Sequence, residues 1–258
     1  MIIVPQSMAY ATLADVKPVY GLYAALLPVA VAAFFGSSRY LATGPVAMVC
    51  LLTSVAAGSL AGGEKETYIL YAVFLAFSVG LFQIILALTK TGKIFDKIPE
   101  HVLLGFTSAA ALIISFSQLS KVFGLPRVSL NDVINYDNFL LANPINIQSL
   151  LISILMLVMM YTIKYKFNKY LTFSNLAVFF AVVVSILLVT SIDYSGPIVG
   201  YIPSGLPIFS LPDFGLFSAS LPMLFIHTVI IAFVGFMEAI AIAKQLPVKK
   251  PPKDANGV

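Results

Sequence analysis

Two polar side chains share one face of the first apolar stretch of the sequence. In VPQSMAYATLAD, residues 4–15, Gln6 and Tyr10 are four positions apart, and Pro5 loosens the turn that precedes them. On a helix, the amide and the phenol would point together at a polar site. The alternative is that both groups form hydrogen bonds with neighbouring helices and only hold them together.

A second stretch predicts a helix start with free backbone donors. In RYLATGPVAMVC, residues 39–50, Thr43-Gly44-Pro45 stands before an apolar run. Proline suits the first helical position and Thr or Gly can cap it, so we expect the helix to begin near Pro45. If residues 40–43 enter the membrane in extended form, the N–H groups and the positive dipole end face a cavity and can hold an anion. The alternative is a surface loop followed by an ordinary helix start.

Glu238 is the carboxylate that lies well inside an apolar run, IIAFVGFMEAIAIAK at residues 230–244. A charge near the bilayer centre is costly, which favours a role as proton carrier, cation ligand or partner of a buried base. The alternative is a carboxylate close enough to the interface to stay hydrated. Gln83 and His227 are expected to be hydrogen-bonded packing partners, and Cys50 a small buried apolar residue.

Composition identifies the environment of these groups. The 258 residues are 60% apolar and 10% charged, with a mean hydropathy of +0.98, whereas a soluble domain is roughly 45–50% apolar and about 25% charged. We therefore predict an all-α polytopic membrane protein. Uncharged runs predict eight membrane segments, at about 2–14, 19–36, 44–61, 68–89, 101–120, 147–163, 173–192 and 221–243.

Seven of these segments are long enough to cross the bilayer or nearly so. The first has about 13 residues, roughly 20 Å of helix, and we expect the natural helix to begin upstream of Met1. Residues 1–244 are predicted to form a partial transmembrane domain. Residues 245–258 are predicted to form a basic, disordered tail.

Charge gives the predicted segments a direction. If the first segment runs outward, 11 of the 15 basic residues lie on the cytoplasmic side and seven of the 11 acidic residues on the other. This bias follows the positive-inside rule and places the tail in the cytoplasm. It leaves no basic groove for a nucleic acid.

Two short stretches suggest an internal repeat. QSMAYA at residues 6–11 aligns with EAIAIA at residues 238–243, with Gln6 opposite Glu238 and two alanines in register. Seven predicted segments separate the two starts, so the helices would run in opposite directions, as an inverted repeat requires.

The sequence resembles the SulP sulfate-permease family of anion transporters. The resemblance covers almost the whole chain and is carried by VPQSMAYATLADVKPVYGLYAALLPV (4–29), FFGSSRYLATGPVA (34–47), LLGFTSAAALIISFSQLSKVFGL (103–125), VGYIPSGLPIF (199–209) and FVGFMEAIAIAK (233–244). It implies the first half of a seven-plus-seven inverted-repeat fold, with a short extended segment before the third helix. It also implies a core domain that moves against a gate domain.

The resemblance also implies a site. The anion would lie between the N-terminal ends of the third and tenth helices, near side chains of the first. The matching residues here are Gln6, Tyr10, Gly44, Pro45, Val46 and Ala47. Val46 stands where some relatives carry an aromatic ring. Glu238 matches an acidic position that is linked to cation coupling in the family.

The resemblance implies secondary active transport of an inorganic anion of the sulfate, bicarbonate or chloride class across the cytoplasmic membrane, coupled to a proton or sodium. Family members continue through further helices and usually a STAS domain, so we expect this chain to be incomplete without that C-terminal half. The alternative is a non-transporting membrane fragment that acts only as an assembly or packing partner. The sequence shows no nucleophile motif and no metal-ligand spacing, so we expect no enzyme, cofactor or metal site.

Overall fold

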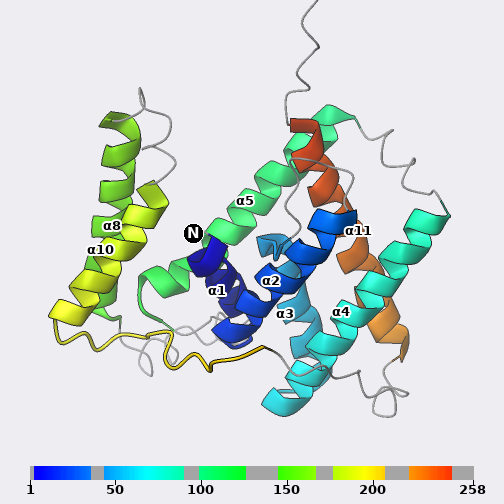
Figure 1. The fold of residues 1–258 in the computed structure, drawn as a ribbon, viewed down its shortest axis with the longest axis horizontal. Coiled ribbons are helices and arrows are strands. Elements are labelled where there is room, and N and C mark those ends of the chain that lie inside the picture. The colour runs from blue at the N-terminus through cyan, green and yellow to red at the C-terminus, as the bar shows by residue number, and fades with distance from the viewer. Residues whose placement is uncertain are drawn as a thin grey trace, which may run out of the picture. The chain divides into compact units, whose positions relative to one another are not determined.

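The computed structural model describes residues 3–35, 44–89, 99–125, 145–166, 177–206 and 221–245, and these residues form helices and turns without strands (Figure 1). The helices are α1 (Ile3–Leu13), α2 (Pro18–Phe35), α3 (Ala47–Ala61), α4 (Lys65–Leu88), α5 (Glu100–Val122), α8 (Ile147–Lys166), α10 (Ala177–Ser191) and α11 (Leu221–Gln245). Each matches one predicted segment to within a few residues, which confirms the all-α fold class.

Among the described residues, five helices are long and apolar enough to cross a membrane: α2, α4, α5, α8 and α11. The helices α3 and α10 are apolar but have 15 residues each, about 22 Å at 1.5 Å per residue. Of the seven segments predicted to cross or nearly cross the bilayer, five therefore form helices of full crossing length, and α3 and α10 form shorter ones. The protein is an integral multi-pass membrane protein.

The chain forms two compact units, one of residues 1–6 and 112–204 and the other of residues 7–111 and 205–258. The smaller unit contains α8 and α10, which contact each other. The larger unit contains α2, α3, α4 and α11, together with most of α1. The helix α5 runs from one unit into the other. The helix α11 ends at Gln245, next to the boundary predicted at 244/245, and residues 246–258 lie outside the described part of the chain.

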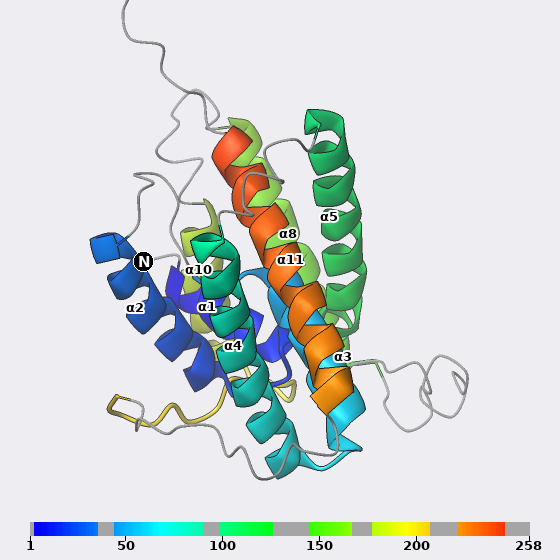
Figure 2. The same ribbon diagram turned by 90° about the vertical axis from the view of Figure 1, so that its right-hand side faces the viewer.

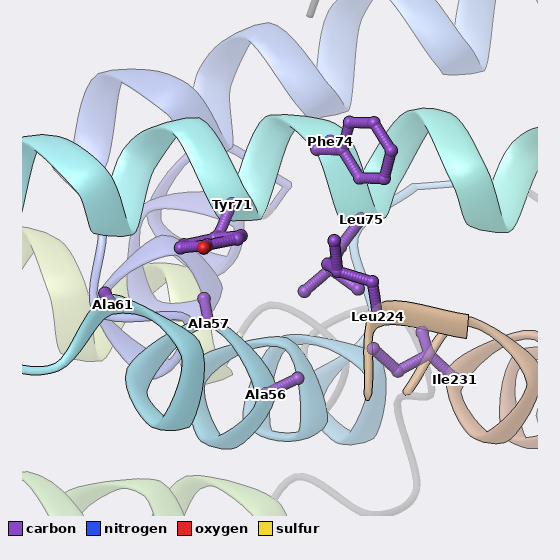
Figure 3. Close-up of a cluster of buried hydrophobic side chains, with 8 residues drawn as sticks. All are labelled: Ala56, Ala57, Ala61, Tyr71, Phe74, Leu75, Leu224 and Ile231. Atoms are coloured by element: carbon purple, nitrogen blue, oxygen red, sulfur yellow. The ribbon is translucent and has the colours of Figure 1, made fainter. Parts of the chain in front are cut away.

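Three helices of the larger unit pack against one another, because α3, α4 and α11 are all in pairwise contact (Figure 2). Their shared core is drawn in Figure 3, where Tyr71 and Leu75 point from α4 toward α3 and α11. The residues of α3 in this core are alanines, Ala56, Ala57 and Ala61. Small side chains allow close approach of helices in lipid, where packing rather than water exclusion drives association.

The end of α3 is set by glycine. Gly62 is the C-cap of this helix and has φ +57°, in the left-handed region that glycine adopts without steric cost. A β-branched residue could not end the helix there at so little cost. The turn to α4 is therefore encoded locally.

A polar cluster holds the smaller unit together at the start of α8. The Asn146 Oδ1 caps the helix by accepting from Ser149 N (2.9 Å), and the Ser149 hydroxyl bonds the Tyr194 hydroxyl (2.8 Å). Gln148 donates to Asp193 O and accepts from Ser195 N. The turn after α10 is thereby fixed to the first turn of α8. Residues 192–206, which follow α10, are non-helical.

Candidate functional site

The helix α3 begins two residues later than the sequence predicts. Its first intrahelical hydrogen bond runs from Cys50 N to Val46 O (3.0 Å), so Val46 is the N-cap and Ala47 the first helical residue. Pro45 lies outside the helix, which corrects its predicted place at the first helical position. The physical reason is the backbone of Val46, which is extended at φ −122° and ψ 142°, a conformation that suits a β-branched residue.

The first turn of α3 has free backbone donors. The first N–H groups of any helix have no carbonyl partner within it, and the valine at the cap makes no side-chain hydrogen bond to them. The aligned peptide dipoles add partial positive charge, equivalent to about half an elementary charge at a helix start. The positive charge at this end of α3 therefore comes from the backbone, since residues 44–50 contain no Lys, Arg or His.

A cavity of about 330 Å³ lies against this helix start, within the larger unit. One face of α3 forms a wall, because Val46, Val49, Cys50 and Thr53 follow the spacing of successive helical turns. The lining residues are Ala11, Ala14, Val16, Tyr20, Gly21, Ala24, Gly44, Pro45, Val46, Val49, Cys50, Thr53, Ile69, Ala72, Val73 and Ala76. None of them is charged, and most are apolar and small.

The structure brings together part of the predicted site. Gly44, Pro45 and Val46 all line the cavity, while Ala47 is buried beside them at 7% exposure. Tyr10 is half-buried on α1 and is not among the lining residues. Gln6 is exposed and belongs to the smaller unit, whereas the residues that line the cavity belong to the larger one. Residues 40–43, whose extended course was predicted, lie outside the described residues.

Glu238 lies on α11 with one carboxylate oxygen, Oε2, buried and without a hydrogen-bond partner in the described part of the chain. Its helix α11 packs against α3, the helix that carries Cys50. Glu238 is not among the residues that line the cavity. The residues described include no group of three His, Cys, Asp or Glu side chains placed to hold a metal ion.

Two other polar side chains of the larger unit, Gln83 and His227, lie at contacts between helices, as predicted. Gln83 Nε2 donates to the Ala232 carbonyl across α4 and α11 (3.5 Å), and His227 Nε2 lies 3.5 Å from the Ser59 hydroxyl across α11 and α3. These interhelical bonds confirm that both residues are packing partners.

Several cavity residues were not anticipated from the sequence. Cys50 and Thr53 were missed, although they lie one and two turns after Val46 on the same face. The small residues of the neighbouring helices were missed too. The signal for one pair was present, since Ala72 and Ala76 are four residues apart, which is the small-residue spacing of close helix contacts.

Comparison with known proteins identifies the family. The model of the sulfate permease family matches residues 1–256. Sulfate transporter 4.1, chloroplastic, of Arabidopsis thaliana is 37% identical over 259 residues, which cover 96% of this chain and 37% of the relative. Prestin of Danio rerio is 31% identical over 275 residues, covering 95% of this chain and 37% of the relative. The chain thus spans little more than a third of the length of these relatives.

Two solved structures share the fold. The transmembrane domain of the cyanobacterium bicarbonate transporter BicA superposes with a TM-score of 0.73 at 23% identity, over 94% of this chain and 63% of that one. SLC26A9 superposes with a TM-score of 0.70 at 22% identity, over 96% of this chain and 43% of that one. These matches confirm the expected inverted-repeat transporter fold. The chain belongs to the sulfate permease family.

Proposed function

We propose that the protein carries out secondary active transport of an inorganic anion, of the sulfate, bicarbonate or chloride class, and that the start of α3 forms one wall of the anion site. The observation that carries this proposal is a helix N-terminus without a side-chain cap, at a cavity whose described lining residues include no charged side chain. Free N–H groups and a positive dipole end are suited to hold a negative ion at such a place.

The backbone of Gly44, Pro45, Val46 and Ala47 is proposed to face the anion. Gln6 and Tyr10 are proposed as side-chain donors to the same ion, on the strength of the family pattern. With no cation in the cavity lining, a single helix start supplies only about half an elementary charge. The facing helix start, which the family pattern places in the second half of the fold, would supply the rest.

The helices are proposed to form a core that moves against a gate. The division into two compact units supports this, because α2, α3, α4 and α11 fall in one unit and α8 and α10 in the other. Packing of α3, α4 and α11 around a shared core favours their moving as one body. An anion held at α3 would then be carried with that body.

Glu238 is proposed as the coupling residue, which binds a proton or sodium. Its unpartnered, buried Oε2 supports this role, since a buried carboxylate oxygen gains most from a bound cation. Its helix, α11, packs directly against α3, the helix that is proposed to hold the anion. A cation there would reduce repulsion between the carboxylate and the anion.

We further propose that the protein lies in the cytoplasmic membrane with the segment after α11 in the cytoplasm, as the loop charges favour. Because this chain spans 37% of its curated relatives, transport is proposed for the chain together with the second half of the fold and a STAS domain. The alternative is a membrane fragment that does not transport and acts only as an assembly or packing partner. Measurement of anion uptake distinguishes the two.

The test is uptake of labelled sulfate, bicarbonate and chloride into proteoliposomes that contain the full-length protein. Val46→Asp places a carboxylate where the anion is proposed to lie, while aspartate is itself a good N-cap and keeps the helix start stable. Val46→Asn is the matched control, since it caps in the same way without charge. We expect uptake by the Asp variant to fall at least about tenfold below that of the Asn variant. Equal uptake by the two variants would place the anion elsewhere, and no uptake of any anion by the unmodified protein would favour the fragment.

A further inference from the structure

The surface of α8 carries a continuous exposed stripe. Leu151, Ile154, Val158, Tyr161 and Tyr165 are spaced three, four, three and four residues apart, so they lie on one face of the helix. All five side chains are exposed, and the exposure rises to 72% at Tyr161 and 79% at Tyr165. The stripe thus changes from aliphatic to aromatic toward the C-terminal end of α8.

The two tyrosines form an ordered pair. Their rings are stacked, with centroids 6.2 Å apart and planes inclined by 11°. Lys164 and Lys166 are exposed in the same last turn. At about 100° of rotation per residue, these lysines fall on opposite flanks of the tyrosine stripe. The end of α8 therefore presents a flat aromatic surface between two ammonium groups.

The length of α8 places this group at a membrane surface. Twenty residues extend about 30 Å, the thickness of the hydrocarbon core, so the last turn reaches the headgroup region. Tyrosine prefers this level because its ring is apolar and its hydroxyl is polar. Lysines at the same level meet lipid phosphates. Residues 145–166 contain no Asp or Glu, so no carboxylate within them competes for the two lysines.

We propose that Tyr161, Lys164, Tyr165 and Lys166 bind the headgroup of an acidic phospholipid. The ring pair lies against the glycerol and upper acyl region, and the ammonium group on either flank attracts the phosphate from its own side. Charge complementarity selects acidic over zwitterionic lipid, and the positive-inside distribution puts this site in the cytoplasmic leaflet. The inference is independent of the anion site, since it concerns a different unit of the chain.

Roles without lipid selectivity lead to different expectations for these four residues. Lysines in the last turn also complement the negative end of the helix dipole, and they set topology. Neither of those roles requires a preference for one lipid class. A spacing of three and four residues also suits packing against another helix. A covering helix would keep lipid away from Tyr165 altogether.

The chain contains no tryptophan, so Tyr165→Trp introduces a single fluorescent probe at the site. The chain is reconstituted in phosphatidylcholine vesicles with a fixed minor fraction of lipid brominated near the headgroup, either phosphatidylglycerol or phosphatidylcholine. We expect brominated phosphatidylglycerol to quench the probe more than brominated phosphatidylcholine does, by at least about twofold. Rising salt should remove the difference, since the attraction is electrostatic. Equal quenching by the two lipids, or quenching by neither, overturns the proposal.

The lysines are tested in the same probe background. Lys164→Gln with Lys166→Gln is expected to abolish the preference for phosphatidylglycerol and leave quenching by phosphatidylcholine unchanged. Lys65→Gln, at the exposed start of α4, is the matched control and should keep the full preference. A preference that survives loss of both lysines, or that is lost equally in the control, contradicts the assignment. The salt dependence needs no lysine variant, so it stands even if the double variant is poorly folded.

Discussion

Gly21 of α2 lies directly against Ser7 of α1, and a Cβ placed on Gly21 would overlap the Ser7 carbonyl group. The Ser7 side chain is fully buried at this contact. The same glycine lines the cavity. The shape of the cavity wall at Gly21 therefore depends on the close contact between α1 and α2.

Gly21→Ala is expected to destabilise the protein by about 1–3 kcal/mol, because backbone rather than a movable side chain occupies the space. Thermal unfolding in detergent, followed by size-exclusion chromatography, measures the loss. Gly58→Ala is the control, since a Cβ on Gly58 of α3 meets nothing within 4 Å. Alanine should be neutral or slightly stabilising there because of its higher helix propensity. Similar losses in both variants would contradict the close contact.

Two buried serines are expected to respond in opposite ways to replacement by alanine. Ser54 is 4% exposed and its hydroxyl has no hydrogen-bond partner among the described residues, so Ser54→Ala should be neutral or stabilise by up to about 1 kcal/mol. Ser149 is 5% exposed and bonds Tyr194, so Ser149→Ala should destabilise by about 1–3 kcal/mol. Melting temperatures of the two variants provide the comparison. A loss of stability with Ser54→Ala would mean that its hydroxyl has a partner.

Glu238→Gln is expected to separate transport from its driving ion. The amide cannot release a proton and carries no charge to bind sodium, so uptake should stop responding to either gradient while anion exchange continues. Proteoliposomes with imposed proton or sodium gradients measure this. Glu66→Gln, at an exposed position in the first turn of α4, should keep the response. Accumulation that still follows the gradient in the Glu238 variant would remove the coupling role from this residue.

Tyr10 allows a graded test of the first helix. If its hydroxyl donates to the bound anion, Tyr10→Phe should lower apparent affinity by about tenfold, the effect of losing one hydrogen bond to a charged group. Tyr201→Phe is the control, because Tyr201 is 88% exposed in the segment after α10. Labelled-anion uptake over a concentration series gives both values. An unchanged affinity in the Tyr10 variant would leave this residue as a packing group of α1.

The positions of the helices could be predicted because hydropathy acts over whole segments. The run predicted at 147–163 became α8, Ile147–Lys166, and that predicted at 221–243 became α11, Leu221–Gln245. The start of α3 was missed by two residues, since proline is compatible with either side of a helix boundary. The extended backbone of Val46 sets the start of the helix at Ala47.

The cavity was harder to predict because it depends on contacts between distant segments. Val46 and Thr53 lie at the cap and within α3, but the opposite lining comes from Gly21 of α2 and Ala72 of α4. Hydropathy treats these small residues as ordinary apolar positions. Their role follows from how closely two backbones approach, and a single sequence gives no measure of that distance.

The short length of α3 has an electrical consequence. A helix of 15 residues extends about 22 Å, so it covers only part of a hydrocarbon core of about 30 Å. If water reaches the start of this helix, the electrical potential at that depth equals the potential of the adjacent solution. The membrane voltage then falls across a layer that is thinner than the whole hydrocarbon core. An anion entering from that side would cross only a fraction of the membrane field before it binds. Its binding should therefore depend on voltage less steeply than one full elementary charge would require.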